Sequence, residues 1–435
     1  MKPGVVLPVV LLIGISVLLS AVGLFALSVP AAERGWQRNQ IAQREADVRS
    51  ALELLRVHIG RQRESVLLGS APDVEPSWIL REAPNGLVVL RPIDADPTGV
   101  CSPLRAESGR LDIRVTPESW WASVPEFNAI APNLAKVRGS TSVRSLLGAG
   151  VTPEDYATVE PLLTVHAEGP ELQLDGRQRI KLGAIWNDDI AARVTDRFGQ
   201  GAADALADLY ASDRVPQDLS GMVRVLQFFK VPVEDWSEIL DGFSYQGDVA
   251  RGRIDLNTAP EVVLSAVPGI GLAAGQIVAT RASLSAQERS TIVWPVLRDI
   301  ISSEDFDECA SYLTTRSFRW RVDFEVGLVE EDGEDFVSPP DRVSCVIDLG
   351  TPRPSLASWR PMNVDQTVQF LVGERRTEDG EDEEDDERDE RPLPASRQTS
   401  PDVPSRSRST EEPEFQLDVP AGATRAPSRS RPPNA

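Results

Sequence analysis

A long uncharged apolar run at the N-terminus constrains the fold of this chain more than any other feature. No charged residue lies between Lys2 and Glu33, and the apolar stretch from Val5 to Val29 covers 25 residues. As a helix it would be about 37 Å long at roughly 1.5 Å per residue, whereas a hydrocarbon core is about 30 Å thick. It also exceeds the roughly 7–15 apolar residues of a cleaved secretory signal. These lengths predict a transmembrane helix.

The charges on either side of this run predict its orientation. Lys2 and the amino terminus lie before it and the bulk of the chain follows it. The positive-inside rule then places the N-terminus in the cytoplasm and the body outside. An ordinary signal anchor and a cleaved signal peptide remain alternatives. A lipoprotein signal is disfavoured because no cysteine lies near the end of the run.

The helix is predicted to continue beyond the apolar run with an amphipathic pattern. Apolar residues recur with helical spacing at Ile41, Val48, Leu52, Leu55 and Ile59. This spacing places all of them on one helix face, and Arg and Glu fill the other face. We therefore predict one helix over residues 5–60 whose second part packs against a folded head.

Four segments with strand-like patterns flank a central helical region. Residues 85–92 and 110–117 precede it, and residues 317–329 and 341–350 follow it. In 317–329 apolar and polar residues alternate, which is the pattern of a half-buried strand. The simplest arrangement is a single sheet in which the late strands pair with the early ones.

These patterns predict an α+β protein in which a mixed α/β head carries an inserted all-helical domain; the resemblance described below implies that this head is pilin-like. The predicted boundaries are 61–119 and 315–350 for the head, 120–314 for the inserted domain and 351–435 for a tail. The tail is acidic and rich in Pro, Ser and Arg, with few aromatic residues. Because such a segment cannot bury enough apolar surface to offset its ordering entropy, we predict that it is disordered.

The most specific motif of the chain is a helix-hairpin-helix pattern at residues 253–283. Its start, RIDL at 253–256, loosely repeats RIKL at 179–182. Thr258 and Glu261 fit a capping box that opens a helix, and a Pro-Gly-Ile-Gly turn then leads into a second helix. The residues assigned to this hairpin are Asn257, Thr258, Pro268, Gly269, Ile270, Gly271 and Gly275.

Charge around the hairpin helps to decide between two functions. Glycine hairpins of this kind can present backbone amides to a nucleic-acid phosphate. Residues 251–283 contain three arginines and two acidic residues. The whole chain has 45 basic and 67 acidic residues, which gives a net charge of −22. Phosphate binding depends on clustered cations. The charge therefore argues against nucleic acid as a partner and favours a hairpin that braces the helical domain.

The start of the chain also resembles a known kind of leader. A basic segment ending at Gly4 directly before an apolar helix resembles the class III signal of pilins and pseudopilins, which implies cleavage between Gly4 and Val5. Val9 stands where most pilins have a glutamate, as in the K-type minor pseudopilins of type II secretion systems. Residues 141–165 and 303–318 are similar to segments of that family as well.

The resemblance to K-type minor pseudopilins implies a non-enzymatic structural subunit that caps the tip of a pseudopilus. Its implied partners are other minor pseudopilins and the inner-membrane platform of the secretion system. Its implied location is the bacterial inner membrane, single-pass, with the body in the periplasm. The alternative is a membrane-anchored DNA-binding protein, since competence DNA receptors share the pattern LNTA…PGIG found here.

The sequence shows no pattern of an enzyme. His58 and His166, the two histidines, lie near no nucleophile motif, and Gly-Lys-Ser/Thr loops and H-E-x-x-H motifs are absent. We expect no cofactor. The family resemblance implies calcium held by loop carboxylates, but no ligand can be assigned in this sequence. Cys101, Cys309 and Cys345 are expected to be buried free thiols, with a single disulfide as the alternative.

Overall fold

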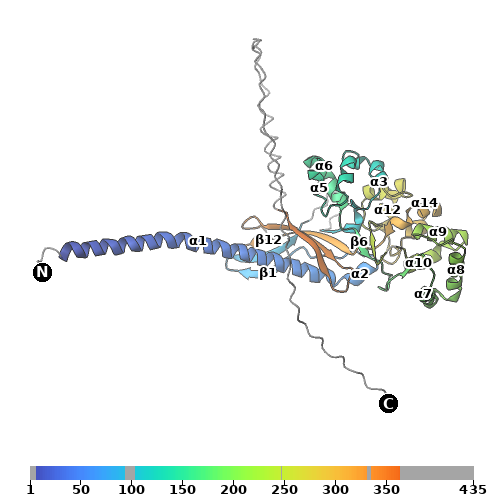
Figure 1. Cartoon of the computed structure of the whole chain (residues 1–435), viewed down its shortest axis with the longest axis horizontal. Helices are drawn as coiled ribbons and strands as arrows, with labels where there is room; N and C mark the ends of the chain where they lie inside the picture. Colours follow the sequence, from blue (N-terminus) through green and yellow to red (C-terminus); the bar gives the residue numbers. More distant parts are fainter. Residues whose placement is uncertain (1–5, 94–102, 246, 331–334, 363–435) are drawn as a thin grey trace, which may run out of the picture. The chain divides into compact units, whose positions relative to one another are not determined.

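The computed structural model of the chain describes residues 6–93, 103–245, 247–330 and 335–362, except for the side chains of 6–10 and 25–31 (Figure 1). The predicted cleavage site at Gly4 and Val5 lies outside the described residues, as do Cys101 and the acidic part of the predicted tail.

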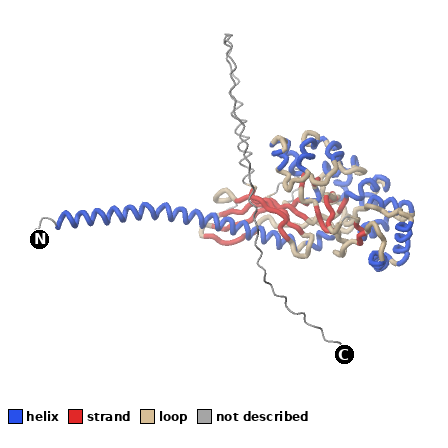
Figure 2. The backbone as a smooth tube through the Cα atoms, in the orientation of Figure 1, coloured by secondary structure: helices blue, strands red, loops and turns tan. Residues whose placement is uncertain are grey.

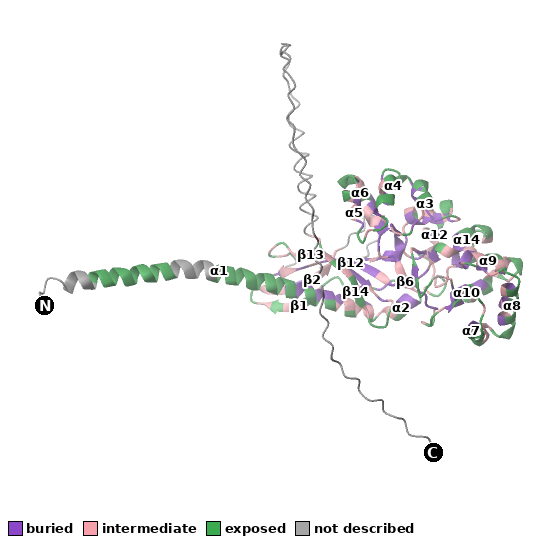
Figure 3. Ribbon diagram, viewed as in Figure 1, coloured by how far each residue is buried: buried purple, intermediate pink, exposed green. Residues whose placement is uncertain are grey.

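The N-terminal helix α1 (Val6–Gly60) is 55 residues long, and only its C-terminal part belongs to the core (Figures 1 and 3). Four of the five residues predicted to share one face are buried against the head: Val48, Leu52, Leu55 and Ile59. The fifth, Ile41, is 59% exposed, because burial of the helix begins only at Asp47. The predicted packing of this face is therefore confirmed for the last four turns.

The predicted transmembrane helix is wrong. In the described part of the chain, no helix combines the length and the apolar character that crossing a membrane requires. The predicted single-pass location in an inner membrane is contradicted with it. The structure shows a mixed α/β fold without such a helix among its described residues.

A six-stranded antiparallel sheet forms the head (Figure 2). Its strands are β1 (Trp78–Ala83), β2 (Gly86–Pro92), β3 (Leu104–Ala106), β12 (Arg319–Val329), β13 (Asp341–Asp348) and β14 (Ser355–Pro361). The order is β1-β2-β12-β13-β14, and β3 also pairs with β12. Val326 of β12 lies opposite Leu90 of β2, so the predicted pairing of late with early strands is confirmed. Trp320, Val322 and Phe324 join the hydrophobic cluster that holds α1 on the sheet.

Two segments of the head differ from their predictions. Of residues 110–117, predicted as a strand of this sheet, only β4 (Leu111–Asp112) is a strand, and it belongs to a separate small sheet. Conversely, the edge strand β14 lies inside the range predicted as a disordered tail. Its residues alternate between exposed and half-buried, and such an edge strand carries only a weak apolar signal in the sequence.

Between β3 and β12 the chain forms three similar helical units, each closed by a two-residue parallel ladder. The ladders are β4 with β5 (Leu163–Thr164), β7 (Ile180–Lys181) with β8 (Phe243–Ser244), and β10 (Ile254–Asp255) with β11 (Leu313–Thr314). One antiparallel pair, β6 (Glu168–Pro170) with β9 (Val249–Arg251), lies between the units. The inserted region was predicted to be all-helical. These strand pairs show that it is not.

The helices of the three units are short, and a single hydrophobic cluster spans all three. The first unit contains α3 (Glu118–Ser123), α4 (Ala131–Leu134), α5 (Ser145–Gly148) and α6 (Pro153–Val159). The second contains α7 (Asp188–Phe198), α8 (Gln200–Ala211), α9 (Leu219–Phe228) and α10 (Val233–Gly242). The third contains α11 (Glu261–Ser265), α12 (Ala274–Arg281), α13 (Trp294–Leu297) and α14 (Ser303–Cys309). A further short helix, α2 (Arg63–Leu67), follows α1.

The same backbone hydrogen bond closes each of the three ladders. The bonds are Ile113 N to Thr164 O (3.0 Å), Leu182 N to Ser244 O (2.9 Å) and Leu256 N to Thr314 O (2.9 Å). An arginine precedes the first strand of every unit, at positions 110, 179 and 253. The sequence repeat predicted between the second and third units thus extends to a first copy that begins at Arg110.

Candidate functional site

The helix-hairpin-helix motif forms the core of the third unit. Its turn lies between α11 and α12, and Gly269 has a φ of 77° there. A Cβ atom on Gly269 would overlap the carbonyl oxygen of Asp305 in α14, so the turn packs directly against that helix. Gly271 also has a positive φ, of 42°, but faces open space. A Cβ on Gly275 would lie 3.0 Å from the carboxylate of Glu261, which shows how closely α12 approaches α11.

Asn257 and Thr258 support the backbone rather than cap a helix. The Asn257 side-chain amide donates to the carbonyl oxygens of Arg289 at 2.9 Å and Thr315 at 3.0 Å, and thus connects three segments of the third unit. Thr258 Oγ1 donates to Asp255 Oδ2 at 2.9 Å. The predicted capping box of Thr258 is wrong, because the N-cap residue of α11 is Pro260, and no described side chain caps it.

The surroundings of the turn are acidic and apolar. Glu304, Asp305 and Glu308 of α14 are exposed, and Asp305 and Glu308 lie beside Gly269. Ile270 is buried inside the turn. Pro268 is exposed, and Leu272, directly after the turn, is fully exposed. A nucleic-acid phosphate at this turn would meet carboxylates where its binding requires cations. Of the seven residues assigned to the hairpin, Asn257, Gly269 and Gly275 make close contacts inside the third unit, whereas Pro268 and Gly271 face outward.

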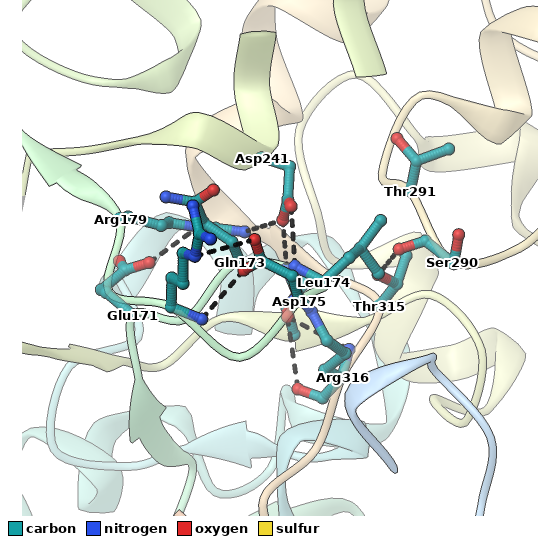
Figure 4. A network of polar contacts seen from close by, with 12 residues as sticks. Glu171, Gln173, Leu174, Asp175, Arg179, Asp241, Ser290, Thr291, Thr315 and Arg316 are labelled. Atoms are coloured by element: carbon teal, nitrogen blue, oxygen red, sulfur yellow. Dashed lines mark hydrogen bonds and ion pairs between the residues drawn. The ribbon is translucent and has the colours of Figure 1, made fainter. Parts of the chain in front are cut away.

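A buried ionic cluster joins the second and third units at the edge of the head (Figure 4). We call it the junction network; its members are Glu171, Arg179, Asp241, Arg253 and Arg316. Glu171 pairs with Arg179 at 2.9 Å and Arg253 at 2.5 Å, and Asp241 pairs with Arg316 at 2.6 Å and Arg179 at 3.3 Å. Burial tends to raise the pKa of Asp241, but the charges of Arg316 and Arg179 outweigh it and lower that pKa.

A second buried cluster ties the first unit to the sheet. Glu107 is completely buried and accepts a hydrogen bond from Arg321 Nε of β12 at 2.7 Å and another from the Thr164 hydroxyl. Arg110 lies 3.8 Å from the same carboxylate. Burial would raise the pKa of Glu107, yet the charges of Arg321 and Arg110 overcome it and hold the pKa at about 2. Glu107 is therefore ionised at neutral pH.

One contact resembles part of a hydrolase site. His166 Nε2 lies 3.3 Å from Ser358 Oγ of β14, a pairing that the sequence alone did not suggest. Burial lowers the pKa of His166. A catalytic histidine of this type is oriented by a carboxylate, and the nearby Glu107 carboxylate is already held by Arg321 and Thr164. The described residues thus lack the third member of a triad at this point.

Other reactive groups of the described residues are also engaged or shielded. Cys309 and Cys345 are buried free thiols, as expected, and burial raises the pKa of each to about 12. Within the described ranges, no group of three His, Cys, Asp or Glu side chains could hold a metal ion. The implied calcium site stays an untested prediction.

Sequence reasoning did not single out the acidic members of either buried cluster. Glu107, Glu171 and Asp241 look like ordinary surface carboxylates in the sequence, because nothing local marks them as buried. The arginines at 110, 179 and 253 do carry a signal, because they recur at the start of each unit, and their side chains are at most 10% exposed. Because buried arginines require acidic partners, this repeat predicts that some carboxylates of the chain are buried as well.

Comparison with known proteins adds a structural likeness. No family model matches the sequence, and neither does any curated protein. A solved structure described as the GspK-GspI-GspJ complex from the enterotoxigenic Escherichia coli type 2 secretion system matches 75% of this chain and 99% of that chain, with 10% sequence identity and a TM-score of 0.29. A likeness of this degree identifies neither a family nor a function, so function must be inferred from the residues themselves.

Proposed function

We propose that this protein is a non-enzymatic structural subunit of a bacterial secretion apparatus, similar in role to a K-type minor pseudopilin. One observation carries the proposal. Helix α1 buries its last turns on the sheet of the head, while residues 11–24 and 32–46 of the same helix are exposed (Figure 3). Such a helix is a stem that extends from its own domain and is available to other subunits.

The exposed apolar surface of the stem calls for a partner. Leu11, Ile15, Leu18, Leu19 and Val22 are between 49% and 65% exposed, and they lie within three turns of one helix. Exposed apolar patches of this kind mark interaction sites in soluble proteins. Helices pack on such a surface with their own apolar side chains. The partners that suit it best are the apolar helices of other minor pseudopilins.

The inserted region suits a terminal position in an assembly. Its three units form a bulky helical body with its own hydrophobic cluster, beyond the sheet on which α1 packs. We propose that this body occupies the space that a following subunit would need, so that the protein caps the tip of the pseudopilus. Contact with the inner-membrane platform of the secretion system and cleavage between Gly4 and Val5 belong to the same proposal.

A charge placed on the apolar surface of the stem tests whether this surface binds other subunits. We expect Leu18→Glu in the full chain to reduce co-purification with the I-type and J-type minor pseudopilins of the same genome at least tenfold, which corresponds to about 1.4 kcal/mol. The reason is that a carboxylate would be desolvated between packed helices. The measurement is affinity pull-down after co-expression, quantified by mass spectrometry.

Ile185→Glu is the matched control for the stem variant. Ile185 is 75% exposed in the second unit, so the same change of charge there should leave co-purification unaltered. Equal loss in both variants, full retention by Leu18→Glu, or no association of the unmodified chain would each contradict the proposal.

A second candidate function, DNA binding by the hairpin, has support from the LNTA…PGIG pattern alone. Because exposed carboxylates of α14 adjoin the turn, we expect no binding of the full chain to a labelled DNA duplex at micromolar protein and low salt. Fluorescence anisotropy measures this. Salt-sensitive binding that Gly271→Asp abolishes would favour the DNA receptor over the structural subunit.

A further inference from the structure

A small cavity lies inside the junction network. Its volume is about 30 Å³, enough for one or two particles the size of a water molecule. Five charged side chains line it, together with backbone and apolar groups: Glu168, Glu171, Arg179, Arg253 and Arg316. The second and third units and Phe318, the residue before β12, all contribute to its walls, so the cavity lies where these parts of the fold meet.

The charges around this cavity do not balance. The junction network contains three arginines but only two carboxylates, Glu171 and Asp241, which leaves one positive charge. Glu168 also lines the cavity, but Arg319 at 2.5 Å and Arg251 at 3.2 Å already neutralise it. An uncompensated charge in the interior is costly unless a counter-ion accompanies it.

Hydrogen-bond donors of the arginines in the junction network also outnumber the acceptors around them. Arg179 Nε, Arg253 Nε and Arg316 Nη1 are buried and have no hydrogen-bond partner among the described residues. The three side chains are only 10%, 9% and 5% exposed. Burial lowers the pKa of Arg253 and Arg316, yet an arginine keeps its proton at neutral pH. Glu171 Oε1 also lacks a hydrogen-bond partner, although it lies 2.5 Å from Arg253 Nη2. Three buried N–H groups thus stand against one free acceptor atom in the network.

We propose that the cavity of the junction network binds one small monovalent inorganic anion, with chloride as its occupant. A single negative charge would balance the network, and a halide accepts several N–H donors at once. Water could satisfy the donors but not the charge. A doubly charged oxyanion would exceed both the charge and the space, and the arginines would repel a metal cation. The anion would connect the second and third units to the head.

Chloride should stabilise the folded chain at constant ionic strength. We expect the thermal unfolding midpoint to rise saturably as sodium gluconate is replaced by sodium chloride, by roughly 5 °C once chloride exceeds its Kd about 100-fold. Differential scanning fluorimetry of the full chain measures this. A midpoint that is the same in both salts, or one that rises linearly without saturation, would overturn the proposal.

A pair of variants locates the effect. Arg253→Gln removes the excess charge while Glu171 keeps Arg179 as its partner, and it should abolish the chloride dependence. Arg177→Gln removes an arginine that is 72% exposed and does not line the cavity, and it should preserve the dependence. Retention of the saturable rise in Arg253→Gln contradicts the assignment.

A crystallographic measurement decides the matter even if Arg253→Gln fails to fold. Crystals of the unmodified chain soaked in bromide should show an anomalous difference peak within hydrogen-bond distance of Arg179, Arg253 and Arg316. Density there without anomalous signal would identify water and overturn the proposal.

Discussion

Replacing Gly269 with alanine is expected to lower the free energy of unfolding by about 3 kcal/mol or more. Two effects add. Forcing a side chain into a packed site costs about 1–3 kcal/mol, and holding a residue other than glycine at a positive φ costs on the order of 1–2 kcal/mol. At Gly269 the new methyl group would overlap the Asp305 carbonyl oxygen of α14, which cannot move without shifting the helix. Urea denaturation followed by tryptophan fluorescence measures the change.

Gly271→Ala separates these two effects. Gly271 has a φ of 42°, but a Cβ there meets open space, so only the backbone strain remains, about 1 kcal/mol. The difference between the two variants reports how firmly the turn packs against α14. If both variants lose the same stability, the hairpin is not a brace, and the structural interpretation of the glycine turn fails.

Replacing Glu107 with glutamine should cost about 3–5 kcal/mol at pH 7, because breaking a buried ion pair leaves an uncompensated charge. Arg321 and Arg110 would both lose their nearest carboxylate. Since the first unit meets β12 through these side chains, we expect the loss to appear as weakened attachment of that unit to the head. Urea denaturation at pH 7 gives the magnitude.

The pH dependence provides an independent check on Glu107. Its pKa is lowered from 4.5 to about 2 in the folded chain, so the folded state binds fewer protons than the unfolded state between these values. The stabilisation is therefore complete above about pH 4.5 and lost as the pH falls toward 2. The difference in stability between the unmodified chain and Glu107→Gln should shrink over this interval. A difference that is constant from pH 7 to pH 2 would contradict the assignment.

Glu118→Gln is the control for this series. Glu118 is 73% exposed and lies 4.0 Å from Arg138, so solvent screens its interaction. Exposed ion pairs contribute about 0–1 kcal/mol, and we expect a change within about 0.5 kcal/mol at every pH.

Local patterns were sufficient for several elements of the fold. The spacing of Val48, Leu52, Leu55 and Ile59 identified the face of α1 that packs on the head. Alternation in residues 317–329 identified the central strand β12, and its pairing with β2 followed from the order of the segments. Each of these signals is a periodicity in the placement of apolar side chains, which a sequence displays directly.

Other elements depended on contacts between distant residues. Residues 110–117 alternate like a strand of the head, but Leu111 pairs with Leu163 because the first helical unit closes on itself. Thr258 fits a capping box, but its hydroxyl donates to the carboxylate of Asp255 instead. Asp255 is buried, and burial raises its pKa to about 6. The membrane prediction likewise took the apolar character of the N-terminal run as sufficient, and the described part of α1 does not bear it out.

The sequence by itself determined which faces are apolar, where the turns fall and that the chain begins with a long helix, because these are properties of neighbouring residues. Only the tertiary structure decided which charges are buried. Glu107, Glu171 and Asp241 have no local mark in the sequence, and each is paired in the core with arginines that the fold brings against it. Coulomb interactions in a buried site depend on distances across the fold, and no periodicity along the chain encodes them.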